Sequence, residues 1–335
     1  MAEAGRRNLI TDVPGLLVGQ AEDAACRTGT TVVLCAAPAT AAVDVRGGAP
    51  GSRETELLDP AATVSRIDAS VLSGGSAFGL DAAGGVMDGL AALGRGFPVR
   101  DVRVPIVPAA IVFDLMFPGR RHWSGEPPYR RLGREALARA GDDFALGNAG
   151  GGLGAKAGRL KGGLGSASLR LADGATVGAL VAVNSWGSVI RPDNGRLWAA
   201  DQALPGEIPP QPPVVDGPLD PADFSACAPG AAGANTTIAV VATDAPLDKS
   251  GCRRLAIMAQ DGLAQAIRPA HTPFDGDTVF ALSTAPEGVA TTDPARQARL
   301  GAAAANCLAR AIMRAVIAAE PLGGFPSWRA LHVDQ

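Results

Sequence analysis

The chain has 335 residues, of which 47% are hydrophobic and 19% are charged, and its formal net charge is −3. This composition predicts one large or two ordinary globular domains and argues against extensive disorder. The small net charge and the aromatic content of 4% give no reason to expect a nucleic acid or an anionic membrane as a partner.

Short runs of β-type residues alternate along the chain with segments of helical periodicity. The run from Thr176 to Val183 has no polar alternation, so we expect a strand that is buried on both faces. The last helix has Asp293 as its N-cap and Pro294 at its first position. Strands mixed with buried helices predict layered α/β or α+β packing. The expected strands are 30–34, 41–45, 69–72, 176–183, 237–243 and 278–282; the expected helices are 78–93 (apolar stripe Phe78, Leu80, Val86, Leu90 and Leu93), 249–267 and a helix from 294 onward.

The cysteines and the N-terminus bear on the cellular compartment. The five cysteines lack CxxC spacing, and we interpret them as buried small hydrophobes in a reducing compartment. The first residues are polar and lack the apolar core of a signal peptide. No run of eighteen apolar residues occurs, so we expect no membrane span. These features predict a cytoplasmic protein with no membrane partner.

The junction between Asn235 and Thr236 is the most informative feature of the chain. If that peptide bond breaks, Thr236 carries both a nucleophilic hydroxyl and a free α-amine. Such an amine titrates near pH ~8 and can accept the hydroxyl proton without a histidine. This matters because the only histidines, His122, His271 and His332, are too scattered to indicate a His-based site. The structural alternative is a turn that leads into the strand 237–243.

The segment before this junction reads as a linker. Leu204 to Pro229 is rich in Pro, Asp and Ala and shows no periodicity, which predicts an exposed segment that ends just before Asn235. An exposed segment beside a cleavage point suits a chain that is cut there. It suits an ordinary surface loop equally well.

Asp275 and Asp277 flank a glycine just before the strand 278–282. On an extended strand, positions i and i+2 share a face, so the two carboxylates would point the same way. Such a pair can hold an ammonium group and orient a hydroxyl by charge-assisted hydrogen bonds. A polar turn is the structural alternative. A glycosidase pair is a further one, but its two carboxylates normally come from separate elements.

Two other polar residues have a structural and a functional interpretation. Asn184 ends the buried strand, where its carboxamide must find hydrogen-bond partners, either as a structural cap or as an oxyanion donor. Lys161 lies in a glycine-rich turn and is either a solvated charge or, if buried beside a nucleophile, a group that stabilises negative charge or moves a proton.

The glycine clusters resemble phosphate loops only at first sight. The turn from Ser73 to Ser76 precedes a helix, so its backbone N–H groups could hold an anion or an oxyanion. The cluster from Gly147 to Lys156 lacks the Gly-Lys-Ser/Thr ending of a P-loop, which favours tight turns over nucleotide binding. No HExxH, paired cysteines or carboxylate–His cluster at ligand spacing occurs, so we expect neither a metal nor a cofactor.

Several short blocks follow one another along nearly the whole chain: Asp12–Gly15 with Val18-Gly19, Asp44–Gly51, Ser73–Leu80, Lys161–Gly163, Asn235–Thr237 and His271–Thr278. In this order they resemble the L-aminopeptidase/D-amidase family, which includes β-peptidyl aminopeptidases and the hydrolase of aminohexanoate (nylon) oligomers. The resemblance implies an N-terminal-nucleophile hydrolase with an αββα sandwich fold. It also implies a single domain over residues 1–335, self-cleaved into an α chain, 1–235, and a β chain, 236–335.

The resemblance assigns roles to the residues described above. It implies that Thr236 is the nucleophile and is freed by self-cleavage after Asn235. Asp275 and Asp277 match the pair that positions the nucleophile, which consists of two acids in the nylon-hydrolase branch and a Ser/Glu pair in the aminopeptidase branch. Asn184 matches the Asn that stabilises the oxyanion.

The remaining assignments concern the lysine and the substrate pocket. Lys161 is the best match for the catalytic Lys of the nylon-hydrolase branch, with Lys156 as the alternative. Phe113 stands where several members have a Tyr, which removes a hydroxyl from the site, so substrate preference need not follow either branch. We place Phe113, Ser73 and Gly74 in the substrate pocket.

The expected function is therefore autoprocessing amide hydrolysis. The substrates would be peptides, amino-acid amides or amide oligomers, which react through an acyl-enzyme. The resemblance also implies a homo-oligomer, a tetramer or larger. One alternative is an acyltransferase of the ornithine acetyltransferase type, whose nucleophile is also a freed Thr. The other is a non-catalytic binding or assembly protein that stays as one chain.

Overall fold

Strand β2, Thr28–Val45, joins two halves of one large sheet in the computed structural model, which describes residues 3–215, 219–220, 222–228, 235–289 and 292–331. Its first part pairs with β1 and β4, and its last part, from Thr40, pairs antiparallel with β13. The register shifts between Leu34 and Ala39, where the strand passes from one half to the other. Within the described residues the sheet has nine strands, in the order β10-β11-β12-β13-β2-β4-β7-β3, with β1 paired to β2.

The helices and strands have the following bounds. The helices are α1 (Asp81–Ala92), α2 (Tyr129–Ala138), α3 (Lys249–Ala266) and α4 (Pro294–Ala318). The other strands are β1 (Leu16–Asp23), β3 (Ser52–Arg53), β4 (Arg66–Ser73), β5 (Phe97–Val99), β6 (Val102–Val104), β7 (Ala109–Ile111), β8 (Lys156–Ala157), β9 (Leu160–Lys161), β10 (Gly163–Arg170), β11 (Thr176–Asn184), β12 (Thr236–Thr243) and β13 (Thr278–Ser283).

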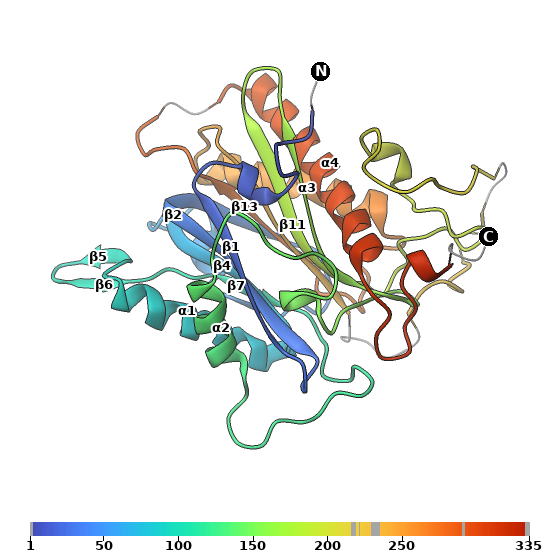
Figure 1. Cartoon of the computed structure of the whole chain (residues 1–335). Coiled ribbons are helices and arrows are strands. Elements are labelled where there is room, and N and C mark those ends of the chain that lie inside the picture. Colours follow the sequence, from blue (N-terminus) through green and yellow to red (C-terminus); the bar gives the residue numbers. More distant parts are fainter. Residues whose placement is uncertain (1–2, 216–218, 221, 229–234, 290–291, 332–335) are drawn as a thin grey trace.

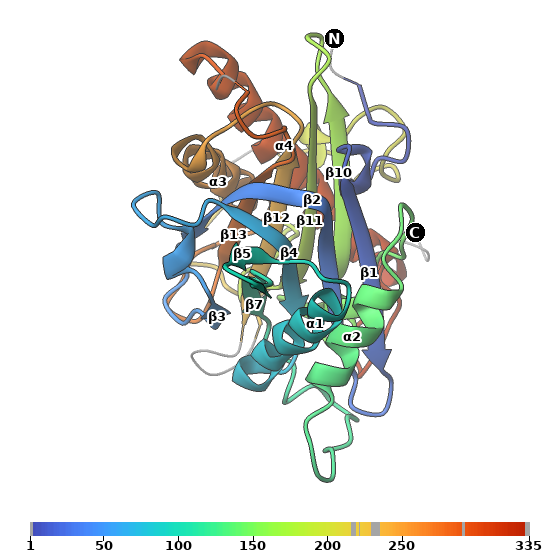
Figure 2. The same ribbon diagram turned by 90° about the vertical axis from the view of Figure 1, so that its left-hand side faces the viewer.

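The elements stack in four layers. Helices α3 and α4 pack on β10–β13, and α1 and α2 pack on β1, β2, β4 and β7 at the opposite side of the molecule (Figures 1 and 2). A separate apolar core fills the space between the two halves of the sheet, with residues from β4 and β7 on one side and from β11–β13 on the other. The expected αββα sandwich is confirmed.

Strand β12 shows why the inner strands are apolar throughout. Ile238 and Val240 belong to the core between the two halves of the sheet, whereas Ala239 and Val241 pack towards α3 and α4. Because successive side chains of a strand point to opposite faces, both faces of β12 are buried. The predicted strand 176–183 is likewise buried at every position, in β11.

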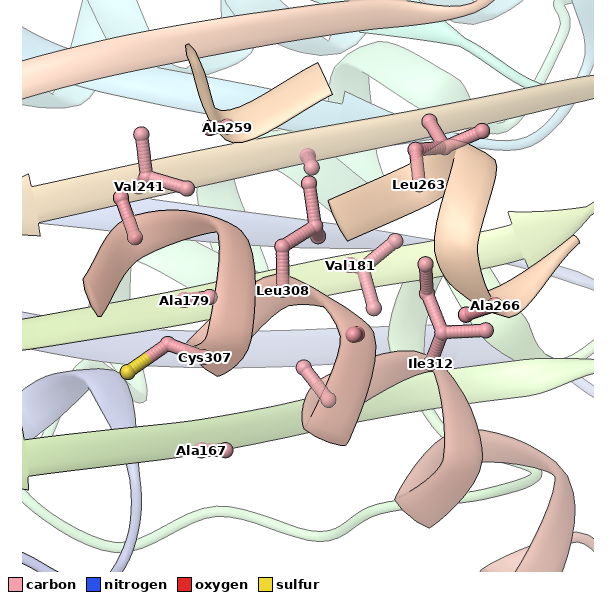
Figure 3. Packing of buried hydrophobic residues seen from close by; sticks show 14 of the residues in the cluster. Ala167, Ala179, Val181, Val241, Ala259, Leu263, Ala266, Cys307, Leu308 and Ile312 are labelled. Atoms are coloured by element: carbon pink, nitrogen blue, oxygen red, sulfur yellow. The ribbon is translucent and has the colours of Figure 1, made fainter. Parts of the chain in front are cut away.

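Helix α4 is a core helix of this fold. Leu308 and Ile312 lie over β10 and β11, beside Leu263 of α3 (Figure 3). The helix is long enough to span a membrane, and an 18-residue window of it has a mean hydropathy of 1.4, but 83% of that window is buried inside the protein. Its N-cap is Asp293, which accepts the backbone N–H of Arg296 at 2.9 Å, as predicted.

Most predicted elements are present, with two corrections. The separate strands expected at 30–34 and 41–45 are parts of the single strand β2. The helix expected at 78–93 begins with a 3-10 turn, Ser76–Leu80, and its two terminal stripe residues are solvent-exposed: Phe78 is 53% and Leu93 is 70% exposed. The five cysteines are buried and unpaired, as expected.

Candidate active site

The Asn235–Thr236 junction lies at the buried start of β12. Both residues are 2% exposed. The Thr236 hydroxyl donates to the carbonyl oxygen of Asn235, so its oxygen lies against the peptide unit that joins the two residues. The backbone N–H of Gly276 donates to the same carbonyl oxygen at 3.1 Å. A fixed N–H aimed at this oxygen is the kind of donor that stabilises an oxyanion.

The two carboxylates of the 275–277 segment lie beside this junction, but on a loop, because β13 begins only at Thr278. Asp277 accepts the backbone N–H of Thr237 at 2.9 Å, and Asp275 accepts the backbone N–H of Trp186 at 2.9 Å. Both are 1% exposed. The two residues therefore do not continue the strand, but both carboxylates accept N–H groups from the consecutive residues His271 and Thr272. Asp277 thus holds the backbone of the residue after Thr236, and Asp275 holds the segment that follows Asn184.

Asn184 is the direct neighbour of Thr236 in the antiparallel ladder between β11 and β12. Its side-chain oxygen accepts the N–H of Lys156 at 3.0 Å, and its Nδ2 donates to the carbonyl of Phe113 at 3.3 Å. The carboxamide is thus fully buried and fixed at both ends, and its residue pairs with Thr236. Both interpretations of this residue, cap and oxyanion donor, fit this position.

Lys161 is completely buried, in contrast to a solvated turn residue. Its ammonium donates to the carbonyl oxygens of Gly152 and Gly162 at 3.1 and 2.8 Å. Burial lowers the pKa of Lys161 to about 7, and the negative charge of Asp114 partly opposes this shift. Lys156 is only partly buried, and burial lowers its pKa as well. The environment of Lys161 is therefore the more unusual of the two.

Asp114 is a site residue that sequence reasoning missed, because no motif marks it. It is 2% exposed, follows β7 and interacts electrostatically with Lys161. It accepts the Thr28 hydroxyl at 2.5 Å and the N–H of Gly75 at 2.8 Å. Burial raises the pKa of Asp114 to about 6. The electrostatic interaction between Asp114 and Lys161 is visible only after folding, since the two residues are far apart in sequence.

The Ser73–Ser76 turn does not offer free N–H groups to an anion. The N–H of Gly74 donates to Gly29, that of Gly75 to Asp114, and that of Ser76 to Val112. A β-carbon at Gly74 would lie 2.0 Å from the Asp114 carboxylate, which explains the glycine. These N–H groups are therefore engaged within the protein, which favours the structural interpretation of the turn. Ser73 is fully buried, and its hydroxyl is hydrogen-bonded to the Thr30 hydroxyl. Phe113 is half-buried, and its backbone carbonyl accepts the side-chain N–H of Asn184.

The linker expected at 204–229 is not uniformly exposed. Glu207 is anchored to the fully buried Arg310 by two bonds of 2.7 and 2.6 Å. Near the other end of this segment, Cys227 is buried. The ring centroid of Phe224 lies 5.3 Å from that of Trp186, whose backbone N–H bonds to Asp275. Pro229 lies outside the described residues, as does His332.

The four layers define a class of fold, that of the N-terminal-nucleophile hydrolases. The solved L-aminopeptidase D-Ala-esterase/amidase of Ochrobactrum anthropi, described as a variant of this fold, superposes with a TM-score of 0.69. The superposition covers 97% of this chain and 90% of that one, at 21% identity, which shows the shared fold.

The chain belongs to peptidase family S58, whose family model matches residues 8–329. A protein of Mycobacterium tuberculosis named as an uncharacterized aminopeptidase is 47% identical, with 96% of this chain and 97% of that protein covered. A 6-aminohexanoate-oligomer endohydrolase of Kocuria sp. is 30% identical over 92% of this chain and 84% of that protein. The protein is accordingly an amidohydrolase, and the predicted family is confirmed.

Proposed function

We propose that this amidohydrolase cleaves itself between Asn235 and Thr236 and then uses the freed Thr236 as its nucleophile. The observation that carries the proposal is the contact of the Thr236 hydroxyl with the Asn235 carbonyl, which also accepts the Gly276 N–H. The products are the chains 1–235 and 236–335, held together in one αββα domain.

The self-cleavage proceeds in two steps. Thr236 Oγ1 attacks the carbonyl carbon of Asn235, and the peptide C–N bond breaks as its nitrogen takes up a proton, which leaves an ester and a free α-amine. Water then hydrolyses the ester and leaves a carboxylate on Asn235. The Gly276 N–H stabilises the negative charge on the carbonyl oxygen during both steps.

The freed residue then attacks the amide of a substrate. Its α-amine accepts the hydroxyl proton and passes it to the leaving amine, and water clears the acyl-enzyme. In this scheme Asp275 and Asp277 hold the amine and stabilise the ammonium that forms when it accepts the proton, and Asn184 donates to the oxyanion. Lys161, whose pKa is lowered to about 7 by burial, exchanges a proton readily near neutral pH.

The substrates proposed are peptides, amino-acid amides or amide oligomers. The names of the relatives, an aminopeptidase and an amide-oligomer endohydrolase, support this range. We further propose a cytoplasmic homo-oligomer, a tetramer or larger. Light scattering of the purified protein measures the oligomeric state, and a monomer would contradict this part of the proposal.

Mass measurement under denaturing conditions tests the proposal. The wild-type protein is expected to give two polypeptides that meet between Asn235 and Thr236. Thr236→Ala should remain one chain and should not hydrolyse amino-acid p-nitroanilides or amide oligomers, whereas Thr236→Ser keeps a hydroxyl and should retain both activities in part. A Thr236→Ala protein that processes itself or turns over substrate would refute the proposal. Addition of an amine acceptor distinguishes acyl transfer from hydrolysis.

A further inference from the structure

A histidine that has no role in the scheme above is bonded to one of the two site carboxylates. His271 Nδ1 lies 2.9 Å from Asp277 Oδ2, and the backbone N–H of His271 donates to the same oxygen at 3.0 Å. The other oxygen, Oδ1, accepts the N–H of Thr237 at 2.9 Å. The carboxylate of Asp277 is therefore held between the histidine and the residue that follows the nucleophile.

The hydrogen bonds of the imidazole assign its tautomer. Nδ1 faces a carboxylate oxygen, which can only accept, so the ring proton belongs on Nδ1. His271 Nε2 is buried and has no hydrogen-bond partner among the described residues. A proton on Nε2 would place an unpaired N–H donor in a buried position. The neutral ring with the proton on Nδ1 therefore fits the site, and its single hydrogen bond is to Asp277.

The backbone of His271 is shaped for this contact. Its φ is +58°, in the left-handed region that residues with a β-carbon rarely adopt. In this conformation one residue presents both its N–H and its ring to the same oxygen of Asp277. Strained backbone of this kind persists where the surrounding structure determines it, and it is concentrated at functional sites.

The second carboxylate of the pair has different partners. Asp275 accepts the Thr272 hydroxyl at 2.5 Å, the Thr272 N–H at 3.3 Å and the Trp186 N–H at 2.9 Å, and no histidine within the described residues bonds to it. Burial and the negative charge of Asp277 raise the pKa of Asp275. Two buried carboxylates that interact strongly do not both ionise readily, so the better solvated or better bonded member keeps the charge.

We propose that His271 is a positioning residue that fixes Asp277 as the ionised member of the pair and leaves Asp275 as the member that exchanges a proton. This assignment rests on the proposed function, in which cleavage creates an ammonium at Thr236. Asp277 already bonds the N–H of the adjacent residue, Thr237, one peptide unit from that ammonium. The carboxylate that His271 holds is therefore the one suited to pair with the new charge.

The first experiment measures the tautomer directly and does not depend on activity. In uncleaved Thr236→Ala protein labelled with ¹⁵N at its histidines, the three histidines can be assigned by single substitutions, His271→Asn among them. His271 is expected to show a neutral ring protonated on Nδ1 at pH 7.5. A ring protonated on Nε2 alone would overturn the proposal.

The second experiment compares mature, cleaved variants by steady-state kinetics. His271→Leu removes the side-chain donor, whereas His271→Asn keeps an N–H donor and tolerates the left-handed backbone. The Leu variant should lose about 10- to 100-fold in kcat, the range that a hydrogen bond to a charged group contributes, with KM changed by less than about twofold. The acidic limb of its kcat/KM profile should move to higher pH, because Asp277 loses a donor that favours its ionised form.

The Asn variant and a surface control complete the design. His271→Asn is expected to recover most of the lost kcat, and His122→Leu, at an exposed histidine, should behave as wild type. A Leu variant with wild-type kcat and an unmoved acidic limb would overturn the proposal, as would an Asn variant as impaired as Leu. Failure of the proposed function appears separately, as turnover by Thr236→Ala.

Discussion

The burial of Lys161 makes a quantitative prediction about stability and pH. Its side chain is fully buried, and its pKa is lowered from 10.5 to about 7, because burial penalises the charged form. Between these two values the unfolded chain carries the proton on Lys161 and the folded chain does not. The unfolded state then binds more protons, so the contribution of Lys161 to the free energy of unfolding rises with pH across this window and is lost as pH falls through it.

The magnitude follows from the linkage relation. One proton of difference changes the free energy of unfolding by about 1.4 kcal/mol per pH unit, so the contribution of Lys161 should grow by about 3 kcal/mol between pH 7.5 and 9.5. Lys161→Met removes the titrating group and keeps a similar unbranched volume. The difference in the free energy of unfolding between the protein with Lys161 and the Lys161→Met protein should therefore change by this amount over the same pH range. Contributions from titratable groups that both proteins share cancel in this difference.

Urea unfolding followed by tryptophan fluorescence at pH 7.5, 8.5 and 9.5 measures this difference. Both proteins carry Thr236→Ala, so that each unfolds as a single chain. Lys156→Met is the matched control: because Lys156 is only partly buried, its difference from wild type should depend less on pH. If the difference in unfolding free energy between the Lys161→Met and reference proteins stays constant from pH 7.5 to 9.5, the reasoning about a neutral buried lysine is refuted.

Other substitutions test the junction and the anchors of the fold. A β-carbon at Gly276 would lie 2.6 Å from the Ala49 carbonyl oxygen and 2.9 Å from Thr236 Oγ1, so Gly276→Ala should slow self-cleavage at least about tenfold in a gel time course. Arg310→Met leaves buried Glu207 unpaired and should lower the free energy of unfolding by about 3–5 kcal/mol, with partial recovery when Glu207→Gln is added. Asp293→Ala removes the α4 cap and should cost about 1 kcal/mol in the same urea assay.

The predicted strands and strand β10, which was not predicted, differ in their side chains. The predicted strands are mainly apolar, whereas β10 contains buried serines that need hydrogen-bond partners. Runs such as β11 and β12 are apolar on both faces, so local pattern is enough to recognise them. Strand β10 contains Ser166 and Ser168, which are fully buried. Ser166 donates to the Ala179 carbonyl on the neighbouring strand β11 and accepts the N–H of Ile10, which lies 156 residues away in the sequence. Burial that depends on such distant partners leaves no local signal.

The residues of the candidate site also differ in whether a local sequence pattern marks them. Thr236 and Asn184 stand at the ends of apolar strands, so their positions could be read from the chain, and β11 and β12 place them as direct neighbours. Asp114 has no comparable signal, and His271 opens the block His271–Thr278 without an assigned role, because each acquires its significance from a contact made in the folded state. The catalytic roles of the predicted residues stay predictions until the variants described above are measured.

The geometry of the junction also orders events in the proposed mechanism. Thr236 is 2% exposed, and its hydroxyl is engaged with the Asn235 carbonyl, which occupies the position that a substrate carbonyl would need. The Gly276 N–H is engaged by the same oxygen. One nucleophile and one donor cannot serve two carbonyls at once, so substrate turnover requires that Asn235 leave first. Activity should therefore rise in step with the cleaved fraction during maturation, and full turnover by an uncleaved chain would contradict this order.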